Sequence, residues 1–412
     1  MKAAETNFKC RSCSSNNGEI VLDLGIQPLA NNLLNKSDLN KPEPKFPLRL
    51  AVCKNCWLMQ LFDIVPPLKL FSENLYFSSS SETMVEHFRK ATERYIKEFN
   101  LNKDSFVIEI ASNDGYLLKN FVAAKIPCLG IEPAQNLAEV AIKQGVPTVV
   151  ESFCEQYARK LAAEDKQADI IIANNVFDHV PNINDFVEGL KIALKPMGTV
   201  ILEFPYGIEM IKKTEFDTIY HDHIFYFTLN SLIPVFAQHG LQVYNVERLP
   251  IHGGSLRLFI GIPRNHFISD SVKMLLEEEE QEGIKNLEFY ERFSKRVQKL
   301  KKELVNLIYD LKSKEKKIAA YGASAKGSTL LNYFQLNKSI IDFIADKSVH
   351  KQEKFSPGTH IPIVPAEWLI KRKPDFTLLL AWNFVDEILK EQEKYRKQGG
   401  KFIIPVPDIK II

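Results

Sequence analysis

The chain has 412 residues, of which 45% are hydrophobic and 25% are charged, and its formal net charge at pH 7 is only +2. This length allows two to three domains, each with its own hydrophobic core. Lysines and arginines are spread along the chain, so we predict neither a nucleic-acid-binding patch nor a membrane partner. No apolar run approaches the roughly 20 residues that span a bilayer, and residues 1–6 lack the apolar stretch of a signal peptide, so we expect a cytoplasmic protein.

Four of the six cysteines form two Cys-x-x-Cys pairs near the N-terminus, Cys10 with Cys13 and Cys53 with Cys56. The spacing within each pair lets both sulfurs face one ion, so the four thiolates can close a tetrahedral Zn²⁺ site. A pair of disulfides and a redox or catalytic role are the alternatives. Because four sulfurs leave no open position for water, we expect a structural zinc in a module over residues 1–75.

Strand and helix patterns alternate after this module, which predicts an α/β protein with parallel strands and crossover helices. The predicted core covers 76–265 and begins with an amphipathic helix near 82–99. Its predicted strands lie at 106–110, 128–131, 169–173 and 199–204, followed by two antiparallel strands at 241–246 and 256–260. We predict a charged helical connector over 266–316 and a second α/β domain over 317–412. Strands of this domain are predicted at 317–322, 341–345, 376–380 and 402–404.

The first core strand leads into the segment EIASNDG, residues 109–115, and the second strand ends at Glu132. Ligands of open α/β sheets lie at the carboxyl ends of the strands. An acidic side chain after the second strand can accept hydrogen bonds from the ribose hydroxyls of an adenosine cofactor. The segment has one glycine, whereas the pyrophosphate of a dinucleotide requires several, and this favours S-adenosylmethionine over NAD. An ordinary strand-to-helix turn is the alternative.

Three features together resemble the sugar C-methyltransferases: the four-cysteine module, the segment EIASNDGYLL from Glu109, and Tyr220-His221-Asp222-His223. The likeness runs over essentially the whole chain in the same order. This family acts on nucleotide-linked (dTDP) 4-keto-deoxysugars with a zinc-binding N-terminal domain, a Rossmann-like methyltransferase core and a C-terminal α/β domain. The resemblance implies that S-adenosylmethionine contacts Glu109, Asn113, Asp114, Gly115, Glu132 and Asn175.

Methyl transfer to carbon requires a base that removes the proton beside the ketone and leaves an enolate. By the resemblance, His223 is this base and Asp222 orients it. Tyr220, Tyr76 and His179 line the sugar pocket, with Tyr76 or His179 polarising the keto oxygen. Asp222 stands where the family has Glu, so its carboxylate arm is one methylene shorter. Histidines beside aromatic residues are otherwise often only packed and hydrogen-bonded, and that is the alternative.

Two further segments are candidates for binding the nucleotide-sugar. The Gly253-Gly254 pair allows close backbone approach and Arg257 can meet a phosphate, although a plain turn into a strand explains the pair equally well. Ser324 and Lys326 lie between a strand and a helix of the C-terminal domain, where backbone amides and the helix dipole attract phosphate. Asp346 ends the next strand and is assigned to the ribose or base.

The resemblance implies an S-adenosylmethionine-dependent C-methyltransferase that methylates a nucleotide-linked 4-keto-deoxysugar, at carbon 3. The alternatives are O- or N-methylation of a similar sugar and a non-catalytic zinc-ribbon binding protein. An NAD-dependent sugar enzyme is disfavoured by the missing glycines. The nucleotide base, the exact sugar and the oligomeric state are not predicted.

Overall fold

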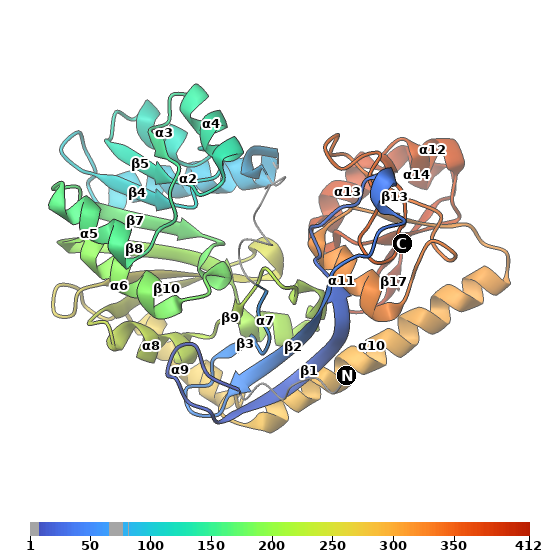
Figure 1. Cartoon of the computed structure of the whole chain (residues 1–412), viewed down its shortest axis with the longest axis horizontal. Coiled ribbons are helices and arrows are strands. Elements are labelled where there is room, and N and C mark those ends of the chain that lie inside the picture. Colours follow the sequence, from blue (N-terminus) through green and yellow to red (C-terminus); the bar gives the residue numbers. More distant parts are fainter. Residues whose placement is uncertain (1–7, 66–76, 81) are drawn as a thin grey trace.

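A computed structural model of the chain describes residues 8–65, 77–80 and 82–412, and within them the strands form three sheets (Figure 1). The first is antiparallel, with the order β1 (Gly18–Pro28), β2 (Lys45–Cys53), β3 (Met59–Leu61) and β9 (Phe225–Tyr226). The hairpin of β1 and β2 is long, and β2 becomes fully buried toward Cys53. β9 belongs to the core, where it follows the predicted catalytic segment, and it pairs with β3 of the N-terminal module. The module and the core therefore share one sheet.

The second sheet has seven strands in the order β10-β11-β8-β7-β4-β5-β6. Their bounds are β4 (Val107–Ile110), β5 (Cys128–Ile131), β6 (Thr148–Val149), β7 (Ala168–Asn174), β8 (Leu194–Pro205), β10 (Gln242–Leu249) and β11 (Ser255–Gly261). β4 pairs in parallel with β5 on one side and with β7 on the other, so the strand order reverses at β4. β11 is antiparallel to both β8 and β10, which confirms the predicted late antiparallel strands. The two-residue β6 is too short to give a sequence signal.

Helices pack against both faces of this sheet. They are α2 (Glu82–Glu98), α3 (Leu118–Ala123), α4 (Gln135–Lys143), α5 (Glu155–Ala163), α6 (Ile183–Ala193) and α8 (Leu229–Ala237). The short helix α7 (Gly207–Lys212) follows β8. α2 buries Phe88 and Tyr95 in one apolar cluster with Ile201 and Phe259 of the sheet. Short 3-10 helices η3 (Phe177–His179), η4 (Phe216–Thr218) and η5 (Ile251–Gly253) lie in the loops of the core, and η2 (Ser78–Ser80) precedes α2.

Two helices lead to the C-terminal domain, α9 (Asp270–Gln281) and α10 (Leu287–Ser313). α10 buries residues at spacings of three and four, including Phe293, Val297 and Leu300, as an amphipathic helix does. The third sheet has the order β14-β13-β12-β15-β16-β17. Its strands are β12 (Ile318–Tyr321), β13 (Ile344–Asp346), β14 (Ile363–Pro365), β15 (Phe376–Leu379), β16 (Lys401–Ile404) and β17 (Lys410–Ile411), and its helices are α11 (Ala325–Phe334), α12 (Trp368–Arg372), η6 (Trp382–Phe384), α13 (Val385–Glu391) and α14 (Glu393–Lys397).

The N-terminal hairpin and α10 both run beneath the two lobes in Figure 1. Beyond β1 the chain reaches the C-terminal domain, where Leu34 bridges to Phe355 and the Glu43 carboxylate accepts hydrogen bonds from Gly358 N at 2.9 Å. The N-terminal module therefore contacts both α/β units. In the part of the chain that the structure describes, no helix is both long and apolar enough for a membrane span.

Candidate functional site

The four cysteines of the N-terminal module come together at one end of the β1–β2 hairpin. Cys10 Sγ lies 3.6 Å from Cys56 Sγ, Cys13 Sγ lies 3.6 Å from Cys53 Sγ, and all four sulfurs fall within 4.8 Å of one another. None of them forms a disulfide. A tetrahedral zinc with Zn–S bonds of about 2.3 Å requires sulfurs about 3.8 Å apart, so this set fits one zinc ion.

The cofactor residues predicted from the sequence gather at the carboxyl ends of β4 and β5. Glu132 Oε2 accepts from Asn113 N at 2.9 Å, and Glu132 Oε1 accepts from Ala134 N at 2.8 Å. Each carboxylate oxygen has a second lone pair, so Glu132 can still accept from ribose hydroxyls. Gly115 has a φ of +80°, and a Cβ there would lie 3.0 Å from Val146, which explains why this turn uses glycine.

Several buried polar atoms in this region have no hydrogen-bond partner among the described residues. They are Ser112 Oγ, Asp114 Oδ1, Asn174 Oδ1 and Nδ2, and Asn175 Oδ1. The nearby Glu109 carboxyl is also buried. Burial raises its pKa well above the ordinary value, the neighbouring Glu132 adds to the rise, and a side-chain hydrogen bond from Tyr116 opposes it. Orphaned buried polar groups are costly in a folded protein, so this cluster fits a polar ligand that supplies the missing partners.

The segment before α2 also reaches this region. Ser78 N donates to Asn113 Oδ1 at 2.9 Å, and Ser79 N donates to Asp114 Oδ2 at 3.3 Å. Asn175 follows β7, the other neighbour of β4, and its φ of 52° lies in the left-handed region. All six predicted cofactor residues therefore lie along one edge of the core sheet.

His223 is held by two hydrogen bonds within its own loop. Its Nδ1 lies 2.9 Å from the Thr218 carbonyl oxygen, and its Nε2 lies 2.6 Å from Tyr220 Oη. A carbonyl only accepts, so Nδ1 carries the proton in the neutral ring and Nε2 carries the lone pair. The His179 ring packs edge-on at 4.8 Å between ring centroids. The structure thus brings three of the predicted catalytic residues together.

The carboxylate paired with the His223 Nε2 atom belongs to Asp178, a residue that was not among those predicted from the sequence. Asp178 Oδ2 lies 3.8 Å from His223 Nε2, and Asp178 Oδ1 lies 3.9 Å from His179 Nε2. Asp222, to which we assigned the orienting role, accepts a hydrogen bond from Asn31 Nδ2 at 2.7 Å. Asp178 directly precedes His179 and follows the carboxyl end of a core strand. This position is the sequence feature from which Asp178 could have been predicted as a site residue. Tyr76 lies outside the described residues.

Arg257 lies inside the core sheet. Its side chain is 4% exposed, and it donates to Glu203 Oε2 at 2.7 Å and to Glu247 Oε2 at 3.4 Å. Its cross-strand neighbours are these same two glutamates. Because its guanidinium is engaged by two carboxylates, its assignment to a substrate phosphate stays a prediction without added support.

The neighbouring Gly253 is required for packing. A Cβ at this position would lie 2.4 Å from the Glu215 carboxylate, so glycine leaves the space that the Glu215 side chain occupies.

The predicted substrate residues of the C-terminal domain cluster where β12 and β13 end. Ser324 Oγ caps α11 by accepting from Gly327 N at 3.0 Å, and Asp346 Oδ2 accepts from Ala323 N at 2.7 Å. Lys326 Nζ lies 4.4 Å from the centre of the Trp382 ring. The structure therefore places Ser324, Lys326 and Asp346 around one helix N-terminus.

Three family models match successive parts of the chain. They are described as "Putative zinc binding domain" for residues 10–71, "Methyltransferase domain" for 84–246 and "C-methyltransferase C-terminal domain" for 250–407. The C-methyltransferase NovU of Streptomyces niveus is 35% identical over 405 residues, which cover 98% of this chain and 96% of the relative. The chain belongs to the C-methyltransferase family. The predicted α/β fold, the methyl donor S-adenosylmethionine and the zinc of the N-terminal module are confirmed.

Solved structures match part of this C-methyltransferase. Magnesium protoporphyrin IX methyltransferase from Synechocystis PCC 6803, solved with bound SAH, is 12% identical with a TM-score of 0.35, covering 47% of this chain and 91% of that one. An S-adenosylmethionine-dependent methyltransferase from Clostridium acetobutylicum is 8% identical with a TM-score of 0.34, covering 43% and 92%. These likenesses add nothing to the assignment.

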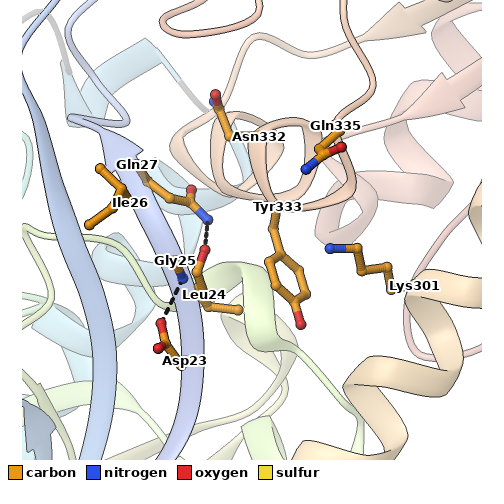
Figure 2. A pocket seen from close by; sticks show the side chains of 9 residues that line it. All are labelled: Asp23, Leu24, Gly25, Ile26, Gln27, Lys301, Asn332, Tyr333 and Gln335. Carbon is orange, nitrogen blue, oxygen red and sulfur yellow. Dashed lines mark hydrogen bonds between the residues drawn. The ribbon is translucent and has the colours of Figure 1, made fainter.

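A cavity of about 420 Å³ is lined by residues other than the predicted site residues (Figure 2). It is bounded by β1 residues from Asp23 to Gln27, by Lys301 of α10, by Asn332 and Tyr333 of α11, and by Gln335 just after that helix. Lys301 Nζ lies 4.0 Å from the centre of the Tyr333 ring. None of its nine lining residues belongs to the predicted site of this C-methyltransferase.

Replacing Glu132 with Ala is expected to weaken S-adenosylmethionine binding at least about tenfold, because a buried charged acceptor contributes about 1.5–3 kcal/mol. Titration calorimetry measures the dissociation constant. Glu139→Ala on the exposed side of α4 is the control and should bind normally. Equal affinities for Glu132→Ala and the wild type would contradict the assignment of Glu132 to the cofactor.

Glu215 gives a pH-dependent prediction. Burial raises its pKa from 4.5 to about 7, with Lys326 opposing the rise and Asp217 adding to it. The unfolded chain therefore releases this proton at lower pH than the folded chain, and folding loses stability as pH rises between these two values. Glu215→Gln should have little effect in acid and stabilise the protein by up to roughly 3 kcal/mol above the folded pKa. Urea unfolding across pH measures this, with exposed Glu288→Gln as control; a pH-independent difference would refute it.

Proposed function

We propose that this enzyme transfers a methyl group to carbon 3 of a nucleotide-linked 4-keto-deoxysugar through an enolate. The observation that carries the proposal is the Tyr220–His223–Asp178 cluster beside the cofactor residues. Asp178 lies in η3 just after β7, and β7 is the parallel neighbour of β4, so their carboxyl ends meet at the same edge. Methylation of oxygen or nitrogen would not require a base for a carbon-bound proton.

His223 removes the proton in this proposal. The Thr218 carbonyl holds the Nδ1 proton, so Nε2 is the basic atom. As Nε2 takes the α-proton, the electron pair of the C–H bond becomes the enolate. The Asp178 carboxylate, 3.8 Å away, stabilises the imidazolium that results. His179 is the described residue placed to polarise the keto oxygen, and Tyr76 stays the second prediction for that role.

The cofactor is held by the strand-end residues. Glu132 would accept hydrogen bonds from the ribose hydroxyls, and Glu109 together with the unpaired atoms of Asp114 and Asn175 would bind other polar groups of the cofactor. When bound, S-adenosylmethionine supplies the methyl group, which passes to the enolate carbon while the C–S bond breaks and its electron pair stays on sulfur. The proton on His223 then passes to solvent, which returns the base to its neutral form.

The nucleotide-diphosphate part is assigned to the N-terminus of α11. The amides of its first turn, the helix dipole and the Lys326 ammonium group all favour a diphosphate. Asp346 supports this turn through Ala323 N, and we keep its assignment to the ribose or base.

Incubation with S-adenosylmethionine carrying a ¹³C-labelled methyl group and a panel of nucleotide 4-keto sugars tests the proposal. We expect one product whose labelled methyl is bonded to the carbon next to the ketone. A methyl bonded to oxygen or nitrogen would instead support the alternative. Exchange of the α-proton with deuterated solvent, without the methyl donor, isolates the base step.

A further inference from the structure

The carbonyl that orients His223 lies in a segment held from outside the core. Thr218, which accepts from His223 Nδ1 at 2.9 Å, is the last residue of η4. η4 is packed against α11 of the C-terminal domain, and α11 lies on the side of that lobe facing the core in Figure 1. The direction of the imidazole therefore depends on how η4 is fixed.

The residues before and after Thr218 in the chain are both hydrogen-bonded to the C-terminal domain. Asp217 Oδ2 accepts from Trp382 Nε1 at 2.7 Å, and Thr329 Oγ1 donates to the Ile219 carbonyl oxygen at 3.2 Å. One residue further back, Phe216 stacks on Phe334 of α11 with centroids 5.1 Å apart and an interplanar angle of 18°. These contacts bracket the Thr218 carbonyl on both sides.

These contacts are buried from solvent, so each hydrogen bond strongly restricts the position of the backbone around Thr218. Asp217 is fully buried, and Thr218, Ile219 and Thr329 are at most 3% exposed. A buried hydrogen bond that is lost leaves a polar group without water to replace its partner. The peptide groups on both sides of Thr218 consequently have one well-defined arrangement while the C-terminal domain is docked.

We propose that Trp382 and Thr329 are positioning residues for the base, acting on His223 through the backbone of residues 217–219. The C-terminal domain then fixes the tautomer and direction of the His223 ring in addition to carrying the nucleotide-sugar. This inference rests on the proposed function only for its catalytic consequence, because the orientation of His223 can be measured without a substrate.

The test uses Thr329→Val, which keeps the shape but removes the hydroxyl, and Trp382→Phe, which keeps a ring but removes the N–H donor. Thr329→Ser restores the donor and should rescue the first variant. Thr377→Val is the matched control, because Thr377 in β15 is equally buried and donates to Tyr395 Oη at 2.8 Å within the C-terminal domain. The full chain is used throughout.

The first readout is the ¹⁵N spectrum of histidine-labelled protein, recorded well above the ordinary histidine pKa, with the His223 signals assigned by their absence in His223→Asn. The wild type, Thr329→Ser and Thr377→Val should show His223 as the single Nδ1–H tautomer. Thr329→Val and Trp382→Phe should show a mixture of tautomers. An unchanged single tautomer in both of these variants would overturn the proposal.

The second readout is α-proton exchange in the nucleotide 4-keto sugar that the wild type accepts. Thr329→Val should lower the exchange rate roughly 10- to 100-fold while the KM for the sugar stays unchanged, since a small misplacement of a catalytic group has that effect. Equal losses in Thr377→Val would mark a general structural effect and count against the proposal. If the wild type exchanges no sugar of the panel, the proposed function fails, and the ¹⁵N spectra still decide the positioning role.

Discussion

Replacing His223 with Asn is expected to reduce both α-proton exchange and methyl transfer by a factor of roughly 10² to 10⁴, the usual contribution of a general base. The Asn side chain keeps a polar group near Thr218 and Tyr220 but has no basic atom at the position of Nε2. Both steps should fall together, because exchange and methylation share the enolate. Deuterium incorporation followed by NMR measures the first step, and labelled methyl transfer measures the second.

A matched control separates loss of the base from loss of the fold. His239→Asn removes another largely buried histidine of the core, which pairs with Glu188 at 2.8 Å, and it should leave both rates close to the wild type. S-adenosylmethionine affinity should be normal in both variants, because Glu132 is untouched. Wild-type exchange in His223→Asn would show that another group takes the proton.

The parts of the site that could be predicted from sequence are those with short-range signals. The spacing of Cys10 and Cys13 is a local motif, and Glu109 and Glu132 each stand at the end of an apolar run that forms a strand. Parallel pairing then brings such strand ends together without further information. The single Gly115 in a left-handed turn is local as well, which is why the residues predicted for the cofactor all lie along one edge of the sheet.

The interactions that could not be predicted join residues far apart in the chain. Asp222 contacts Asn31, 191 residues away, and Asp217 contacts Trp382, 165 residues away. Neither pair has a periodic signal, because each depends on how the modules dock. Asp178 was missed as the partner of His223 for the same reason, since the sequence places Asp222 next to His223 in the chain and gives no sign that its side chain turns toward the N-terminal module.

Replacing the zinc ligand Cys56 with Ser is the second change for which we expect a large effect. The bound zinc content should fall from one ion per chain to nearly none, since zinc sites of this type contribute roughly 10 kcal/mol or more to the folding of small modules. Cys56 precedes β3, and β3 pairs with β9 through Gln60 and Phe225. Leu61 N also donates to the Ile224 carbonyl oxygen at 2.8 Å, one residue after His223.

Loss of zinc should therefore shift the segment that carries His223, because β3 pairs with β9, although the ion contacts no reacting atom. We expect methyl transfer to fall about tenfold or more, as for other misplaced catalytic groups, while S-adenosylmethionine affinity stays normal. Cys154→Ser is the control, because Cys154 is half-buried like Cys56 and lies outside the four-sulfur cluster. Metal analysis that still finds one zinc per chain in Cys56→Ser would place the ion elsewhere, and the Asp178–His179–His223 cluster is the other described set with suitable ligand spacing.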